Sequence, residues 1–209
     1  AGAVATYDCG LPALSASNVP RPSGAGGALT VLSWAGRKAA VTYTFDDGNS
    51  SQIAHYSELA ALNVPFTFYL QTNKTEATNA VWTTALAAGH EIGNHSQSHL
   101  QDPAESVANT DVDAATQFII SHFGVTPYTF AAPWGSAIYS TVASTRFLIN
   151  RGVANGLVLP NDSTTPFKLP CYIPPDNASA SLFNHEVDDA RNRGGWKIVL
   201  VHGFKGGAD

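Results

Sequence analysis

The sequence predicts an α/β fold: a parallel sheet covered by helices. From residue 37 onward, apolar segments rich in β-branched and aromatic residues alternate with segments of helical spacing. The strand segments are apolar on both faces, as expected for parallel strands buried between helices. In addition, the polar residues of interest stand where these strands end, which is where active sites of α/β proteins gather.

The first half of this pattern has five elements. Residues 39–45 form an apolar strand of β-branched and aromatic residues, and residues 52–62 have helical spacing. A second strand is expected at 65–70, a helix at 77–88 and a short strand at 91–93. The two helices stop at Asn and Gly, which tolerate the left-handed backbone that ends a helix.

The second half continues the alternation. Residues 103–123 are amphipathic and end at a glycine, which predicts a long helix, and residues 160–180 form a polar, proline-containing loop. The remaining expected elements are a strand at 128–131, a helix at 136–150, a strand at 152–159, a helix at 182–193 and a last strand at 197–201.

The bulk composition predicts one globular domain preceded by an extension. The chain has 209 residues, enough for a substantial core, and is 44% hydrophobic and 13% charged. Residues 1–36 are rich in Gly, Pro, Ala and Ser, so we expect them to wrap the domain formed by residues 37–209. With a net charge of -5 and no basic run, nucleic acid and anionic membranes are not expected partners, and no apolar segment is long enough to span a bilayer. We expect a monomer.

The pair Asp46-Asp47 at the end of the first strand is the most informative feature. Two adjacent carboxylates repel each other and are costly to desolvate, so a cation is a common partner. Taken alone, the pair would suit a turn or a helix N-cap equally well. Its significance comes from His95 and His99, spaced i and i+4, since one carboxylate and two imidazoles form a recognised site for zinc or another divalent metal.

Three motifs in this order resemble the polysaccharide deacetylases of carbohydrate esterase family 4, the NodB-homology domain. Thr44-Phe45-Asp46-Asp47-Gly48 is similar to the first motif, His95-Ser96-Gln97-Ser98-His99 to the second, and Leu200-Val201-His202 to the last. The resemblance runs from about Arg37 to Phe204 and implies a distorted or incomplete (β/α) barrel of the NodB type.

The resemblance also implies a division of roles. Asp47, His95 and His99 would bind the metal, most simply zinc, with cobalt, nickel and manganese as alternatives. Water on the metal would be the nucleophile, Asp46 the base and His202 the general acid. Trp134, following Pro133, would contribute a backbone N–H to the oxyanion site, and Leu200 would line the pocket for the acetyl methyl group.

The sequence departs from the family pattern at two places. The third motif is Arg-x-Pro-aromatic in the family, whereas here Ala131 stands at the position of the arginine that holds the base. The fourth motif, whose Asp partners the catalytic His, has no clear equivalent; Asp162, Asp176 and Asp188 are the candidates.

The expected location is extracellular. The chain lacks Met, its start at Ala1-Gly2-Ala3 would fit a processed signal peptide, and five Asn-x-Ser/Thr sequons occur. In a secreted protein Cys9 and Cys171 are expected to form a disulfide, the alternative being two unpaired thiols.

The function predicted from the sequence is therefore removal of N- or O-linked acetyl groups from a glycan such as chitin or chitooligosaccharides, acetylxylan or peptidoglycan. The absence of the third-motif Arg and of a fourth motif leaves open a degenerate glycan-binding module of the same fold. A hydrolase of small amides is a further alternative.

Overall fold

The computed structural model describes residues 34, 36–160 and 162–204. The extension expected at residues 1–36 therefore lies outside the described residues, apart from Trp34 and Gly36. A short antiparallel bridge joins Trp34 to Arg37, and the Trp34 indole donates to the carbonyl of Gly194 at 3.1 Å.

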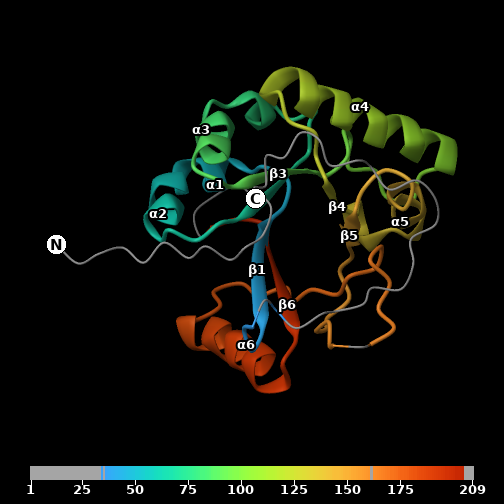
Figure 1. The fold of residues 1–209 in the computed structure, drawn as a ribbon. Helices are drawn as coiled ribbons and strands as arrows, with labels where there is room; N and C mark the ends of the chain where they lie inside the picture. The colour runs from blue at the N-terminus through green and yellow to red at the C-terminus, as the bar shows by residue number, and fades with distance from the viewer. Residues whose placement is uncertain (1–33, 35, 161, 205–209) are drawn as a thin grey trace.

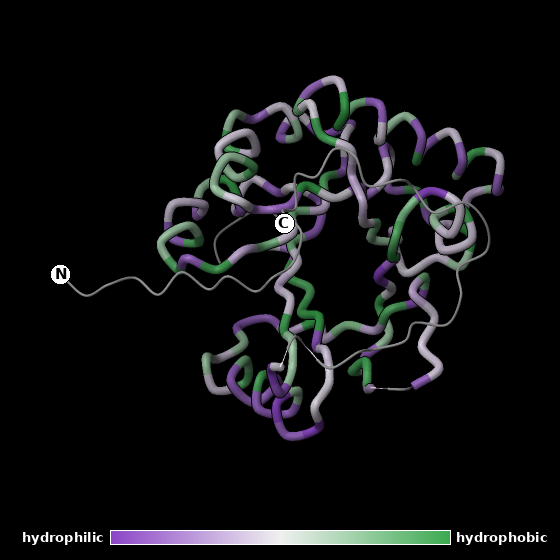
Figure 2. Tube along the Cα trace, viewed as in Figure 1, coloured by the Kyte–Doolittle hydropathy of each residue, from purple (hydrophilic) through white to green (hydrophobic). Residues whose placement is uncertain are grey.

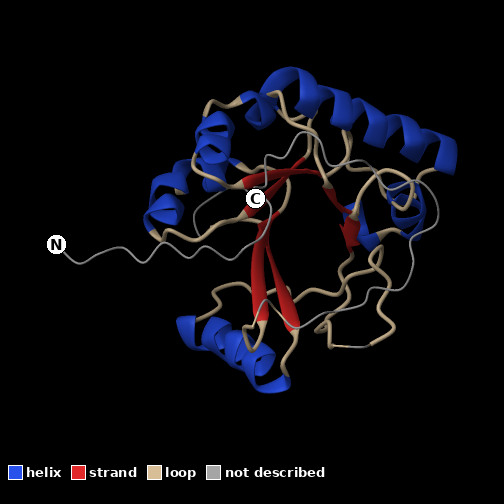
Figure 3. Ribbon diagram, viewed as in Figure 1, coloured by secondary structure: helices blue, strands red, loops and turns tan. Residues whose placement is uncertain are grey.

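Six parallel strands form one curled sheet in the order β5-β4-β3-β2-β1-β6 (Figures 1 and 3). The helices lie outside it, as the sequence predicts for this α/β fold. The strands are β1 (Ala40–Phe45), β2 (Thr67–Leu70), β3 (Glu91–Asn94), β4 (Thr129–Ala131), β5 (Ile149–Arg151) and β6 (Trp196–Val201).

The helices follow the strands in alternation. The first expected helix is divided at His55, and the second is preceded by a 3₁₀ turn. The helices are α1 (Ser50–Ala54), α2 (Tyr56–Ala61), η1 (Thr75–Thr78), α3 (Val81–Ala87), α4 (Glu105–Phe123), η2 (Pro133–Gly135), α5 (Ala137–Ala143) and α6 (Ala180–Arg193). None of the helices in the described part of the chain combines the length and apolar character that a membrane crossing requires.

A loop segment closes the gap between β5 and β6. Leu169 forms a parallel bridge with Arg151, and Tyr172 forms another with Val199. The Tyr172 N–H donates to the carbonyl of Ile198 at 2.8 Å, so residues 169–172 lie between the two edge strands. The curled sheet is thereby brought close to a barrel without a seventh regular strand among the described residues.

The predicted boundary between the fourth helix and the fifth strand is wrong. The helix expected at 136–150 ends at Ala143, and the strand expected at 152–159 is instead β5 at Ile149–Arg151. Asn150 is fully buried, pairs with Phe130 of β4, and donates from its amide to the Ser140 hydroxyl and the Phe167 carbonyl. Sheet pairing and burial at this position outweigh the local helical spacing.

The largest core cluster lies between the sheet and helices α2, α3 and α4. Phe68 is fully buried at its centre, with ring centroids 5.3 Å from Phe45 and 5.2 Å from Trp82. A second cluster packs α4 and α5 against Phe130. Figure 2 shows the complementary pattern at the other edge, with hydrophilic residues along α6 and hydrophobic residues on the neighbouring β6.

We predict that Phe68→Ala lowers the free energy of unfolding by about 3–5 kcal/mol, because it removes a buried ring and leaves a cavity. Urea denaturation measures the change. Leu62→Ala is the control: Leu62 is 62% exposed, and its truncation is expected to change stability by no more than about 0.5 kcal/mol. Equal effects of the two substitutions would contradict this view of the core.

Candidate active site and metal centre

The candidate site lies at the carboxyl ends of the strands, where parallel strands deliver their following residues to one edge. Asp46 and Asp47 follow β1, His95 follows β3, and His202 follows β6. The Asp46 N–H donates to the Val201 carbonyl at 3.0 Å, which extends the pairing of β1 with β6 up to the site.

Several site residues have a left-handed backbone, which is uncommon outside glycine. The φ angles are 72° at Asp47, 63° at Ser96, 52° at His99 and 58° at Trp134. Gly48 continues the turn after β1, and a Cβ there would lie 2.8 Å from a Leu70 methyl carbon. Clustered outliers of this kind mark functional sites more often than ordinary turns.

Asp47, His95 and His99 form a group able to hold a metal ion. One carboxylate oxygen of Asp47, Oδ1, lies 3.3 Å from His95 Nε2 and 3.6 Å from His99 Nε2. Two ligands on a tetrahedral zinc ion, each about 2.0–2.1 Å from it, are about 3.3 Å apart. Within the described residues these three side chains are the group whose ligand atoms all lie within 4.8 Å of one another.

The hydrogen-bonding of these atoms fits a metal. Asp47 Oδ1 and His95 Nε2 are both buried and lack a hydrogen-bond partner, which is costly unless something else satisfies them. The other ring nitrogen of His95, Nδ1, lies 2.8 Å from the Ala131 carbonyl and donates to it, so Nε2 presents its lone pair to the site.

The electrostatics favour a charged carboxylate here. Burial alone would raise the pKa of Asp47, but the imidazoles of His95, His99 and His202 lower it well below its usual range. Burial lowers the pKa of His99, and the neighbouring His95 lowers it further, which keeps its imidazole neutral and able to bind a metal. For His95, burial opposes the charged form, but Asp46 and Asp47 raise its pKa overall.

The loop that carries the two histidines is held by α4 and α5. The carboxylate of Asp111 accepts the Ser98 N–H at 2.9 Å and the Tyr139 hydroxyl at 2.6 Å. The Ser96 hydroxyl accepts the His99 N–H at 2.9 Å. These contacts compensate for the left-handed backbone at Ser96 and His99.

Arg151 is the residue that holds Asp46. Its Nη2 lies 2.5 Å from both carboxylate oxygens of Asp46, and the two side chains are only 1% and 3% exposed. Burial opposes the charged guanidinium, but Asp46 raises the pKa of Arg151 overall. The same guanidinium lies over the Tyr69 ring, 5.7 Å from its centroid.

The arginine that contacts Asp46 comes from β5, one strand away from the position on β4 that the sequence pattern predicts. Ala131 at the end of β4 occupies the position where an Arg is expected, and its register partner on β5 is Arg151. Neighbouring residues in register point to the same face of a sheet, so both positions aim at the same point. The sequence pattern does not single out Arg151, because residue 151 falls between an expected helix and an expected strand; the unpaired charge of Asp46 is the available signal.

The remaining predicted residues lie around this centre. Trp134 is 60% exposed, and its indole donates to the His99 carbonyl at 3.3 Å, while the preceding Pro133 is buried. Leu200 is buried against Leu169 and Cys171. Trp134 thus lies beside the candidate metal site, and Leu200 lies in the wall of the barrel.

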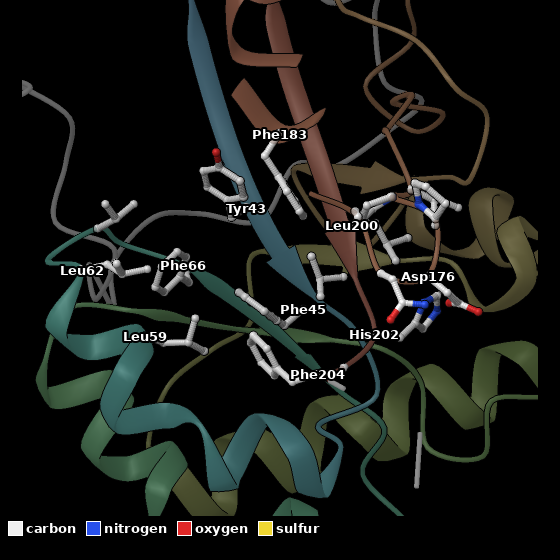
Figure 4. Close-up of a pocket in the computed structure, with 18 residues that line it drawn as sticks. Tyr43, Phe45, Leu59, Leu62, Phe66, Asp176, Phe183, Leu200, His202 and Phe204 are labelled. Carbon is white, nitrogen blue, oxygen red and sulfur yellow. The ribbon is translucent and has the colours of Figure 1, made fainter. Parts of the chain in front are cut away.

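The exposed His202 side chain lines a large open cavity on the β6 side. This cavity has a volume of about 1110 Å³ and apolar walls that include Tyr43, Phe45 and Phe183 (Figure 4). Of the three carboxylates considered as its partner, Asp176 lines the same cavity and lies near His202 in the view. Asp162 instead accepts the N–H groups of Leu159 and Thr164.

The comparison with family models identifies the chain. Residues 35–150, more than half of its length, match the model described as polysaccharide deacetylase. The chain belongs to the polysaccharide deacetylase family. It is therefore a carbohydrate deacetylase, and its fold is the curled barrel that the sequence predicts. A search of curated proteins found no match to this deacetylase.

Solved structures of similar fold support the architecture. The Xyl-CE4 domain of a multidomain xylanase from the hindgut metagenome of Trinervitermes trinervoides is 20% identical, with a TM-score of 0.56, covering 80% of this chain and 75% of that one. A family 4 carbohydrate esterase from Streptomyces lividans, in complex with acetate, is 21% identical, with a TM-score of 0.54, covering 80% and 81%. The Streptococcus pyogenes deacetylase PplD, also with acetate, is 16% identical, with a TM-score of 0.59, covering 68% and 67%.

The structure does not show the expected disulfide. Cys171 is a free, fully buried thiol that donates to the Gly152 carbonyl at 3.3 Å, while Cys9 lies outside the described residues.

We predict that His99→Ala lowers the affinity of this deacetylase for zinc by at least about 10-fold, since even outer-shell changes at metal sites cost 10–100-fold. Isothermal titration calorimetry of the metal-free protein measures the affinity. His122→Ala is the control, because His122 lies on α4 and outside the cluster. Unchanged zinc binding in His99→Ala would exclude this residue as a ligand.

Proposed function

We propose that this protein is a metal-dependent hydrolase that removes acetyl groups, N- or O-linked, from a polysaccharide or oligosaccharide. The observation that carries the proposal is the meeting of a buried carboxylate, Asp46, with the cluster of Asp47, His95 and His99 in a chain of the polysaccharide deacetylase family.

In this proposal Asp47, His95 and His99 hold the metal, with zinc as the first choice for two imidazoles and a carboxylate, and cobalt, nickel or manganese as alternatives. When bound, such a cation lowers the pKa of water and polarises a carbonyl group. A single carboxylate and two neutral imidazoles leave the centre positively charged, which suits both tasks.

Asp46 is the proposed base, taking the proton of the attacking water through its carboxylate. It adjoins the cluster, since Asp46 Oδ2 lies 3.7 Å from His95 Nε2, and Arg151 fixes the orientation of its oxygens. A charge-assisted contact of this kind holds the carboxylate in place.

His202 is the proposed acid, which protonates the leaving amine or alkoxide. His202 follows β6 at the same edge of the sheet at which Asp46 and Asp47 follow β1. We propose Asp176 as its partner because Asp176 lines the same cavity. The backbone N–H of Trp134 is the proposed oxyanion donor, and Leu200 remains the proposed wall for the acetyl methyl group.

An acetylated glycan is the proposed substrate. Trp134 is 60% exposed, and His202 is also exposed, so the site opens to the surface in the way that a chain-like substrate needs. This openness favours a glycan over a small amide. The Xyl-CE4 domain belongs to a xylanase and the Streptomyces lividans carbohydrate esterase is in complex with acetate, which is consistent with acetylxylan as substrate; chitooligosaccharides and peptidoglycan are the amide alternatives. Secretion of the protein remains a prediction from the sequence.

The degenerate binding module is disfavoured by one specific contact. That alternative rested on the absence of an arginine to hold the base and of a fourth motif; Arg151, on the strand next to β4, makes the first of these contacts. The contacts of Asp46 therefore give no reason to expect glycan binding without hydrolysis.

We predict that the purified protein releases acetate from at least one of acetylxylan, chitooligosaccharides and peptidoglycan fragments. Asp46→Asn is expected to lower kcat by at least about 100-fold, because general-base catalysis contributes 10²–10⁴-fold. Chelation is expected to abolish the activity and added zinc to restore it.

The control is Asp113→Asn, which changes an exposed carboxylate that pairs with Arg146 away from the site. Acetate release that survives both chelation and Asp46→Asn would overturn the proposed function.

We further predict that Arg151→Ala destabilises the fold by about 3–5 kcal/mol, since it leaves a buried carboxylate without its cation. The double variant Ala131→Arg with Arg151→Ala returns an arginine to the neighbouring register position and is expected to recover part of both stability and kcat. Urea denaturation and acetate release measure the two effects. If the double variant behaves like Arg151→Ala alone, the two positions are not equivalent.

A further inference from the structure

A single buried amide connects the ends of the two strands that carry the proposed base and acid. Gln52 of α1 is fully buried. Its Nε2 donates to the Asp46 carbonyl at 2.5 Å and to the His202 carbonyl at 2.7 Å. A side-chain amide has two N–H donors, and here each finds one backbone carbonyl.

The segment after β6 receives further contacts from the same short helix and its N-cap. The Asn49 amide donates to the His202 carbonyl at 3.1 Å, and the Ser51 hydroxyl accepts the Phe204 N–H at 3.1 Å. Lys74 in turn donates to the Asn49 side-chain oxygen. His202 lies just beyond the last pair of the β1–β6 ladder, Phe45 with Val201. Beyond the last pair of the β1–β6 ladder, hydrogen bonds from side chains of α1 and its N-cap therefore hold the backbone in place of hydrogen bonds between strands.

We propose that Gln52 is a positioning residue that sets the placement of the acid His202 relative to the base Asp46. This inference rests on the proposed function. The amide bonds to the backbone of both residues at once, so the two proton-transfer groups share one buried link. Displacement of a reacting group by about 1 Å can cost about 100-fold in rate, so a link of this kind affects catalysis without touching the substrate.

The residue type fits this task. A glutamate at position 52 would place a carboxylate against two carbonyl oxygens, and a methionine would fill similar space without a donor. Either change leaves the buried Asp46 carbonyl without this donor, and the His202 carbonyl retains only its bond from Asn49.

Two substrates with different leaving groups distinguish the two roles of the Gln52 amide, which are to stabilise the fold and to position His202. Release of p-nitrophenolate from p-nitrophenyl acetate needs no protonation, whereas the amine of an N-acetylated chitooligosaccharide, or the alkoxide of acetylxylan, does. Damage to the fold lowers both reactions in parallel. Misplacement of His202 lowers only the reaction that needs an acid.

The test compares Gln52→Met with wild type on the glycan substrate and on p-nitrophenyl acetate. For the glycan we expect kcat to fall about 100-fold with little change in KM, and for the aryl ester a loss of no more than about 3-fold. In a His202→Ala background, Gln52→Met is expected to cause no further loss on the glycan, because residues that act through one another are not additive.

Two variants serve as controls. Gln117→Met changes an exposed glutamine of α4 and is expected to leave both reactions unchanged. Phe68→Ala reports general destabilisation, which lowers both reactions together. If Gln52→Met does not fold, Gln52→Glu, which also removes the amide donor, must produce the same selective loss.

Parallel loss on both substrates, or additive loss in the His202→Ala background, would overturn the inference while leaving the proposed function intact. A wild-type protein that releases acetate from none of the glycans would refute the proposed function, and the role of Gln52 with it.

Discussion

The ion pair between Asp46 and Arg151 is the contact on which the rest of the site depends. Asp46 is 2% exposed, and a carboxylate so deeply buried needs a cation or many donors to remain charged. Arg151 supplies that charge from the far edge strand of the sheet, β5, while β1 carries Asp46. The pair can form only because the sheet curls, so the geometry of the barrel and the placement of the proposed base are linked.

The other parts of the centre are arranged around this pair by strand ends and short buried contacts. Asp47 turns away from β1 through a left-handed backbone and meets His95 and His99, whose loop is held by Asp111. His95 uses one ring nitrogen on the Ala131 carbonyl and leaves the other for a metal. Left-handed backbone and two unsatisfied buried atoms, Asp47 Oδ1 and His95 Nε2, thus coincide where a cation would satisfy those atoms.

The position of Arg151 also shows why a missing motif residue is weak evidence for lost activity. Residues in register on adjacent parallel strands point to the same face, so an arginine can move from β4 to β5 and still approach the same carboxylate. A sequence motif specifies the strand from which a side chain comes, whereas catalysis requires only that the charged end of that side chain reaches the right position. The alanine at position 131 therefore does not remove the positive charge beside Asp46, because Arg151 supplies it from the neighbouring strand.

The sequence by itself determined the alternation of strands and helices, the Asp46-Asp47 pair at a strand end, and the spacing of His95 and His99. These features are local or periodic, so a linear pattern contains them. Only the tertiary structure decided that β5 begins at Ile149, that Arg151 holds Asp46 across 105 residues, and that Gln52 bonds to His202 across 150. Such contacts depend on sheet register and curvature, which bring distant residues together and which no short stretch of sequence specifies.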